Sequence, residues 1–328
     1  MKDHDLTRRD FVKVGAAGAA SMMLKTPTVP GSSPGVAMPE RPLGRTGRRV
    51  KLFSLGGQAT LEQDGTHDES IAIINRAIDL GVNYIDTAAA YGRGISQTYI
   101  GEVMATRRDE VYLATKTHDR TRDGSLRLLE ESLRLLQTDH IDCWQLHRIG
   151  RDEDLEQVFG KDGAIEALQQ AREEGVVRFL GITGHADPAP LIRGISEFDF
   201  DTILLAINPA DPHYLPFSEE LLPLANRKGM GVIGMKIPAR GRIFRDGGIT
   251  SMRDAMHWVL SQPVSTVIVG CDTVAQLEEN VSIAADFQPL SPGHMARMTD
   301  LTSDYAKEAL FFRRGARQSS GEEDYEDQ

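Results

Sequence analysis

The chain has 328 residues, of which 40% are hydrophobic, so it can bury a substantial core, and a barrel of roughly 250 residues folds as one domain. Its formal net charge is −11, but five acidic residues lie between Glu322 and Asp327, so the rest is only mildly acidic and we expect no nucleic-acid partner. Two cysteines, Cys143 and Cys271, are too few for a disulfide framework and lack the paired spacing of a zinc or iron–sulfur site, so we expect no metal.

Residues 1–37 are typical of a targeting segment and linker rather than of a folded domain. The sequence TRRDFVK at positions 7–13, followed by small and apolar residues to position 24, resembles a twin-arginine export signal. The apolar run is too short and too rich in Gly and Ala for a membrane span of ~20 residues, so we expect no stable span, and positions 35–37 (GVA) offer a cleavage site. The resemblance implies that the twin-arginine export machinery carries the folded protein to the periplasm or cell exterior. The alternative is an ordinary N-terminal helix on a cytoplasmic protein.

Short apolar runs then alternate with amphipathic segments of helical period. The eight predicted strands cover residues 51–55, 84–86, 111–115, 141–146, 179–183, 202–207, 231–235 and 266–269. The predicted helices cover residues 70–80, 99–106, 125–136, 164–174, 190–196, 220–228, 251–260 and 274–285. Because a parallel crossover needs a long connection, this order predicts a parallel sheet, and eight units favour a closed (β/α)₈ TIM barrel in a single domain over residues 38–290.

The flanking segments are predicted to close or extend this barrel. An open doubly wound sheet is the main rival fold, but the first strand is not followed by the Gly-x-Gly-x-x-Gly turn expected there. Residues 43–50 are predicted to form a Gly-turned hairpin that plugs the lower end of the barrel. For residues 291–328 we predict one helix over 294–310, a basic patch and a disordered acidic tail.

Polar residues follow the predicted strands, at the end where (β/α)₈ enzymes place their reactive groups. The second strand ends at Asp86, the third leads into Lys116 and the fourth into His147. Together the pieces DTAAAYG (86–92), ATK (114–116) and QLH (145–147) closely resemble the signature of the aldo-keto reductases, and the resemblance covers residues 42–285. It implies an NAD(P)-dependent oxidoreductase that reduces an aldehyde or ketone, or oxidises the alcohol, by hydride transfer.

The same resemblance assigns Asp86, Tyr91, Lys116 and His147 to the family's catalytic tetrad. Reduction of a carbonyl leaves negative charge on oxygen, which must receive a proton. Tyr91 would donate it, with its pKa lowered from ~10 by the Lys116 ammonium. Asp86 would hold Lys116 in place, and His147 would orient the substrate oxygen. Each residue taken alone also fits an ordinary structural role, such as that of a turn-forming residue or a solvent-exposed charge.

The cofactor site is predicted at the last two strand-to-helix loops, where barrels often bind phosphate. The resemblance places Gly270, Thr273, Gln276, Glu279 and Asn280 near the adenosine half. The remaining predicted contacts come from strands five to seven and the loop that follows them, namely Thr183, Asn208, Met235, Lys236, Arg240 and Arg242. Other members of the family commonly use NADP(H), so the resemblance favours this cofactor. NAD(H) stays as the alternative, because the basic residues that many members place against the 2′-phosphate are not evident near Gln276.

Three positions depart from the family's usual pattern. Thr183 is followed by Gly184 and His185 where many members carry Ser-Asn, so the usual carboxamide contact through Asn is missing. Met235 stands where an aromatic residue commonly stacks on nicotinamide, and it can still pack on a flat ring. Leu204 stands where a glutamine is common.

Two other functions remain open from the sequence alone. The barrel could be a nicotinamide-binding redox sensor or regulatory protein with little turnover. It could also be a metal-dependent hydrolase that uses the four histidines His118, His147, His185 and His213, although no His-x-His follows the first strand. We expect a small-molecule carbonyl substrate and a monomer or small oligomer, whereas the identity of the substrate depends on loops.

Overall fold

The computed structural model describes residues 37–313, so the predicted export signal and the acidic tail lie outside the described residues. Eight parallel strands close into a barrel in the order β10-β3-β4-β5-β6-β7-β8-β9. These strands are β3 (Phe53–Gly56), β4 (Tyr84–Asp86), β5 (Tyr112–Thr117), β6 (Ile141–Leu146), β7 (Val177–Gly184), β8 (Thr202–Ala206), β9 (Gly231–Met235) and β10 (Thr266–Val269). The predicted (β/α)₈ barrel is therefore confirmed.

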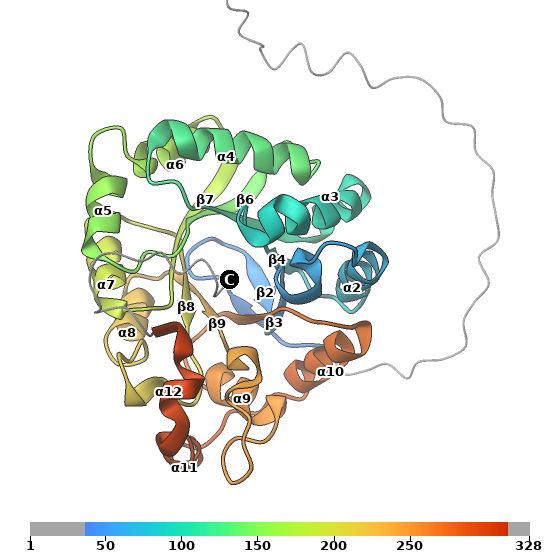
Figure 1. The fold of residues 1–328 in the computed structure, drawn as a ribbon, viewed down its shortest axis with the longest axis vertical. Helices are drawn as coiled ribbons and strands as arrows, with labels where there is room; N and C mark the ends of the chain where they lie inside the picture. Colours follow the sequence, from blue (N-terminus) through green and yellow to red (C-terminus); the bar gives the residue numbers. More distant parts are fainter. Residues whose placement is uncertain (1–36, 314–328) are drawn as a thin grey trace, which may run out of the picture. The chain divides into compact units, whose positions relative to one another are not determined.

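Helices surround the strands and cover their outer faces (Figure 1). They are α2 (His67–Asp79), α3 (Ile95–Arg107), α4 (Arg122–Leu135), α5 (Asp152–Phe159), α6 (Ala164–Glu173), α7 (Pro188–Glu197), α8 (Leu221–Arg227), α9 (Met252–Leu260) and α10 (Val274–Ala285). Side-chain caps explain where several of them begin, because Thr121, Asp187, Ser251 and Thr273 each accept a bond from a backbone N–H of the first turn.

An N-terminal hairpin closes the amino end of the barrel. Strands β1 (Glu40–Pro42) and β2 (Arg49–Lys51) pair antiparallel, with Arg41 opposite Val50. Leu43 and Val50 are fully buried in a cluster with interior barrel residues such as Tyr84 and Tyr112. This contact leaves the carboxyl ends of the strands as the open end, where the polar residues gather.

Apart from shifts of a few residues in element bounds, the structure differs from the sequence prediction mainly at three places. The first barrel strand begins at Phe53, because Lys51 belongs to the hairpin. Helix α5 was not predicted, since only Leu155 and Val158 of its eight residues are buried and its first turn is acidic. The predicted helix over 294–310 is broken into α11 (Pro292–Asp300), a 3-10 turn at Ser303–Tyr305 and α12 (Ala306–Ala309).

The break turns the C-terminal segment back over the barrel. Arg313 is fully buried, and its guanidinium pairs with Asp211 and bonds the carbonyl of Tyr214. The backbone of Ala309 accepts a bond from Asn208 at the end of β8. Within residues 37–313, no helix has the length and apolar character needed to cross a membrane.

Candidate active site

Four side chains predicted from the motifs meet at the carboxyl end of the barrel. The Lys116 amine on β5 donates to Asp86 Oδ2 on β4 at 2.5 Å, to the Thr87 carbonyl at 2.8 Å and to the Tyr91 hydroxyl at 3.1 Å. Tyr91 begins the 3-10 turn Tyr91–Gly94, and its ring meets that of His147 edge-on at 5.7 Å between centroids. The four side chains thus form one connected group.

The Asp86–Lys116 pair is withdrawn from water, since each side chain is 1% exposed. Burial raises the pKa of the Asp86 carboxyl, even though the Lys116 charge opposes the shift. Burial alone would lower the pKa of the Lys116 ammonium, but the charges and hydrogen bonds of Asp86 and Tyr91 leave it above its ordinary value. Gln145 donates to Asp86 Oδ1 at 2.9 Å, so both carboxylate oxygens are bonded. Lys116 is accordingly held as a fixed cation beside Tyr91.

Tyr91 departs from the expected acidified phenol. Withdrawal from water raises its pKa above the ordinary value of a phenol, and the Lys116 charge reduces this shift without reversing it. The expectation of a lowered pKa is therefore wrong, because burial outweighs the effect of one ammonium 3.1 Å away. The hydroxyl is protonated at neutral pH, which is the form that a proton donor requires.

His147 is also neutral. Burial, followed by the nearby charges of Lys116 and Arg148, lowers its pKa well below the ordinary value. Its Nδ1 atom is buried without a hydrogen-bond partner among the described residues. The partly buried Arg120 donates to the His147 carbonyl at 2.8 Å and thereby fixes the backbone that carries the ring. A neutral imidazole keeps one N–H that can be donated to a ligand oxygen.

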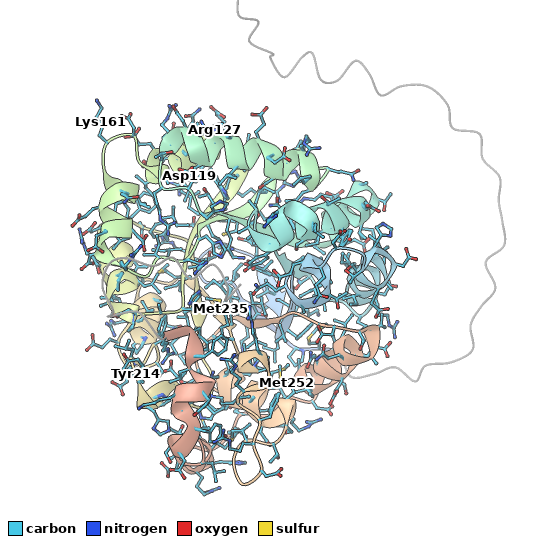
Figure 2. The ribbon with its side chains drawn as sticks, in the orientation of Figure 1. Asp119, Arg127, Lys161, Tyr214, Met235 and Met252 are labelled. Carbon is cyan, nitrogen blue, oxygen red and sulfur yellow. The ribbon has the colours of Figure 1, made fainter. Side chains whose placement is uncertain are left out.

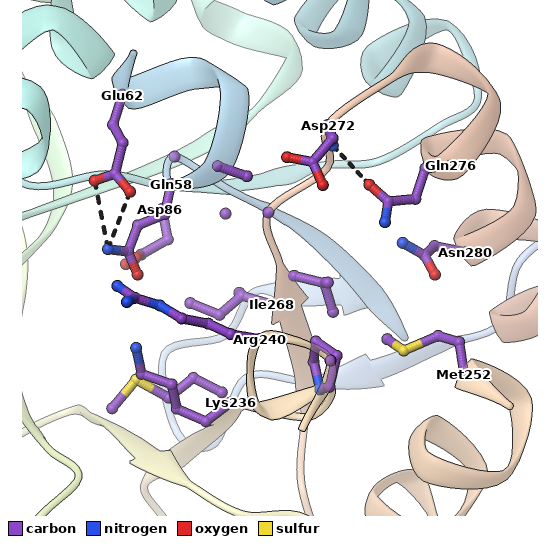
Figure 3. A pocket seen from close by; sticks show the side chains of 18 of the residues that line it. Gln58, Glu62, Asp86, Lys236, Arg240, Met252, Ile268, Asp272, Gln276 and Asn280 are labelled. Carbon is purple, nitrogen blue, oxygen red and sulfur yellow. Dashed lines mark hydrogen bonds between the residues drawn. The ribbon is translucent and has the colours of Figure 1, made fainter. Parts of the chain in front are cut away.

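A cavity of about 760 Å³ adjoins this group, and a smaller one of about 50 Å³ lies between Tyr91, Lys116 and His147. The large cavity runs from Asp86 to the first turns of α10, and Figure 3 shows Gln276 and Asn280 on one side of it and Lys236 and Arg240 on the other. Met235 lines both cavities and lies near the centre of the ring of strands in Figure 2. The two spaces therefore meet at Tyr91 and Met235.

Most predicted cofactor residues line these cavities. Gly270, Gln276, Glu279 and Asn280 line the large one, Thr183 the small one, and Met235, Lys236 and Arg240 line both. Gly270 allows its loop to approach the Gln58 backbone closely, because a Cβ on it would stand 2.9 Å from the Gln58 carbonyl oxygen.

Three predicted cofactor residues do not line either cavity. Asn208 is fully buried, and its amide group bonds the backbone of Lys236, Ala309 and Ala210. Arg242 lies over the ring of Phe311, with 4.1 Å between its guanidinium carbon and the ring centroid. The Thr273 hydroxyl caps α10 by accepting from the Gln276 N–H. These side chains already have partners in the protein, so their predicted contact with a cofactor has no support in the geometry.

Two cations, Lys236 and Arg240, face the large cavity near the Glu62 carboxylate, whose charge acts on both of them without forming an ion pair. The Lys236 amine and the Arg240 guanidinium make no hydrogen bond or ion pair with any residue in 37–313. Burial, and next the charge of Arg240, lowers the pKa of Lys236 to about 8. Both residues hold positive φ angles, 63° and 54°, a conformation that non-glycine residues adopt at a cost and that clusters at functional sites.

This lining fits a dinucleotide. Lys236 and Arg240, together with the N-terminal turns of the twelve-residue helix α10, are suited to phosphate groups, since helix N-termini and basic side chains both attract anions. The apolar side chains of Met252 and Ile268 supply surface for flat rings. Within the described part of the chain, no group of three or more His, Cys, Asp or Glu side chains is arranged to hold a metal ion.

Several residues of the site were not predicted. Gln58 and Glu62 line the large cavity and lie 3.4 Å apart, and withdrawal from water raises the pKa of Glu62. Gln145 and Arg148 were also missed as site residues. Gln145 stands in the QLH piece of the signature, whereas the sequence signal for Arg148 was only its position just after a strand.

Comparison with known proteins agrees with this geometry. The profile of the Aldo/keto reductase family matches residues 53–246, which is more than half of the chain. The chain belongs to the aldo/keto reductase family. It is 28% identical over 294 residues to the uncharacterized oxidoreductase YqkF of Bacillus subtilis, covering 75% of this chain and 91% of that protein. It is 27% identical over 293 residues to L-galactose dehydrogenase of Arabidopsis thaliana, covering 76% and 89%.

Solved structures of other aldo-keto reductases share the fold. Aldo-keto reductase AKR11C1 from Bacillus halodurans, in its holo form, superposes with a TM-score of 0.69 at 25% identity, covering 80% of this chain and 96% of that one. An aldo-keto reductase from Klebsiella pneumoniae in complex with NADPH superposes with a TM-score of 0.68 at 21% identity, covering 80% and 95%. This chain is thus an oxidoreductase of the aldo/keto reductase family, some members of which have been solved with NADPH bound.

Proposed function

We propose that this aldo/keto reductase reduces an aldehyde or ketone with NADP(H), with Tyr91 as the general acid. The observation that carries the proposal is the contact between the Lys116 amine and the Tyr91 hydroxyl at 3.1 Å, next to the His147 ring. Bound in the large cavity, the cofactor supplies hydride to the carbonyl carbon. Lys236, Arg240 and the start of α10 would hold its phosphates, and Met235 would pack against its ring at the junction of the cavities.

The chain's own residues then manage one proton. Negative charge develops on the carbonyl oxygen, and the neutral Tyr91 hydroxyl gives it a proton while His147 donates a hydrogen bond. The phenolate left on Tyr91 faces the Lys116 ammonium, which favours its formation. Asp86 keeps that ammonium charged and oriented. The Asp86–Lys116 pair therefore lowers the activation barrier indirectly, by stabilising the phenolate of Tyr91.

The test is turnover. Purified protein with NADPH and a panel of aldehydes should consume cofactor well above background. Tyr91→Phe should remove most of this activity, because general acid catalysis contributes typically 10²–10⁴-fold. The affinity of this variant for NADPH should stay within about twofold of the wild-type value. Tight NADPH binding without turnover on any aldehyde or ketone would favour the regulatory alternative. Equal loss of binding and turnover in Tyr91→Phe would contradict the role given to the hydroxyl.

We also propose that the protein is exported. The support is the TRRDFVK sequence at positions 7–13 and the small-residue site before Met38. Export in the folded state suits a barrel that binds its cofactor before it leaves the cytoplasm.

A further inference from the structure

The small cavity is lined by cations and neutral groups. Its charged lining residues are Lys116, Arg148, Lys236 and Arg240, and no Asp or Glu among the described residues lines it. The two histidines that border it carry no charge at neutral pH, since burial lowers the pKa of His147 well below its ordinary value and that of His185 to about 3. The space in which a carbonyl compound would sit is therefore positively charged.

Three of these four cations already have an ion-pair partner or a proposed role in binding the cofactor. Lys116 is paired with Asp86. Lys236 and Arg240 also line the large cavity, where they face the proposed phosphates. Arg148 lines the small cavity but not the large one, and within residues 37–313 its guanidinium has no hydrogen bond, ion pair or ring contact. One guanidinium thus remains for the substrate.

The backbone of Arg148 is fixed in an unfavourable conformation. Its φ is 57°, in the left-handed region that an L side chain rarely adopts. Its N–H donates to the Thr183 hydroxyl at 2.9 Å, and its carbonyl accepts from Arg120 at 3.2 Å. Arg120 in turn pairs with Asp154, which accepts bonds from the N–H groups of Gly150 and Arg151. Such strain persists only where the surroundings over-determine it, and here the bonds hold the backbone of Arg148, an exposed residue, at the border of the small cavity.

The charge of Arg148 reaches the groups around the cavity. It is among the charges that lower the pKa values of His147, His185 and Lys236, which surround the reacting position. A planar guanidinium matches a carboxylate with two parallel hydrogen bonds. A single cation balances one carboxylate, whereas a phosphate dianion would leave charge uncompensated.

We propose that Arg148 binds a carboxylate of the substrate, so that the enzyme acts on small oxo acids, meaning aldehydes or ketones that carry a carboxylate. This inference rests on the proposed function of the site. The cavity of about 50 Å³ sets the size, because one water needs roughly 10–15 Å³ of such volume, and the reacting end of the substrate therefore has only a few non-hydrogen atoms.

The kinetic test compares 4-oxobutanoate with butanal, which has the same chain length and no carboxylate. The wild-type enzyme should show kcat/KM about 10-fold or more higher for the oxo acid. Arg148→Gly removes the guanidinium and tolerates the positive φ. It should lower the ratio of the two kcat/KM values about 10- to 100-fold, mainly through KM, as expected for one charge-assisted interaction. Arg148→Lys keeps the charge but not the fork, and should fall between the two. The matched control is Arg151→Ala, which removes an exposed cation of the same loop outside the cavity and should leave the ratio unchanged.

A binding test separates this inference from the proposed function. With NADP⁺ in place of NADPH no hydride can be delivered, so calorimetry of wild type and Arg148→Gly with 4-oxobutanoate reports affinity without turnover. Weaker binding by about 10-fold or more in the variant supports the carboxylate site even if no aldehyde is reduced. Equal binding by both proteins, or turnover with no preference for the oxo acid over butanal, overturns the inference while leaving the reductase proposal intact. A preference for glyceraldehyde 3-phosphate over 4-oxobutanoate would also overturn it, in favour of a phosphate.

Discussion

Replacing Asp86 by Asn should destabilise the protein in a way that depends on pH. The substitution keeps the shape of the side chain but removes the only carboxylate within residues 37–313 that pairs with Lys116, whose side chain is 1% exposed. The ammonium must then either stay charged without a partner or lose its proton. The loss in free energy of unfolding cannot exceed the cost of deprotonating Lys116. At pH 7 this ceiling is about 4.6 kcal/mol for a lysine with an unfolded pKa of ~10.4, at 1.36 kcal/mol per pH unit.

The sign of the pH dependence follows from proton binding. In the variant, the unfolded state binds more protons at Lys116 than the folded state does, so stability rises with pH. The ceiling falls to about 1.9 kcal/mol at pH 9. In the wild-type protein the pKa of Lys116 lies above its ordinary value, so this residue stays charged in both states over the same range.

The assay is urea unfolding of both proteins at pH 7 and pH 9. We expect the variant to be less stable by about 3–4.5 kcal/mol at pH 7, which is the usual cost of breaking a buried pair limited by the deprotonation ceiling, and by at most about 1.9 kcal/mol at pH 9. Asp199→Asn is the control, since Asp199 pairs with Arg45 at the surface and its side chain is 72% exposed. A deficit below about 1 kcal/mol at pH 7, or one that does not change with pH, would refute the reasoning.

Two further predictions concern the cofactor and the export signal. Because the pKa of Lys236 is about 8, the affinity for NADPH should fall between pH 7 and pH 9.5 as the ammonium loses its charge, and Lys236→Arg should flatten this dependence; fluorescence titrations with the same slope for both proteins would contradict the role given to Lys236. Replacing Arg8 and Arg9 by Lys should retain the protein in the cytoplasm of a host with twin-arginine export, and fractionation that finds both forms equally outside would count against an export signal.

The fold was predictable because its signals are local. Strands β4, β6, β9 and β10 have the bounds expected from the sequence, since each is a short apolar run that ends at a turn. Helix starts were less accurate: α4 begins three residues before the predicted position because Thr121 supplies a cap outside the apolar pattern. The broken C-terminal helix depends on Arg313 reaching Asp211, a contact across about a hundred residues that no local pattern reports.

The candidate site was predictable only in part. The motifs located Asp86, Tyr91, Lys116 and His147 because each lies at or soon after the carboxyl end of a strand of the ring, and parallel strands bring these ends together. The pKa of Tyr91 was not predictable, since it depends on how far burial outweighs one charge.

Two of the predicted cofactor contacts likewise depend on packing that no local pattern reports. Asn208 and Arg242 have partners in the distant C-terminal segment, Ala309 and Phe311, which take them away from the cavities. Arg148 was overlooked because an exposed arginine in a loop has no periodicity to mark it, and its positive φ is visible only in the structure.

The central claim is that Tyr91 protonates a carbonyl oxygen while hydride reaches the carbonyl carbon. The most direct measurement is a single turnover with NADPH deuterated at the transferred position of the nicotinamide ring, followed by mass spectrometry of the alcohol formed. We predict that the wild-type enzyme places one deuterium on the former carbonyl carbon and that Tyr91→Phe, with cofactor bound, forms at least about 100-fold less labelled product in the same time. Labelled alcohol formed at the wild-type rate by Tyr91→Phe would contradict the claim.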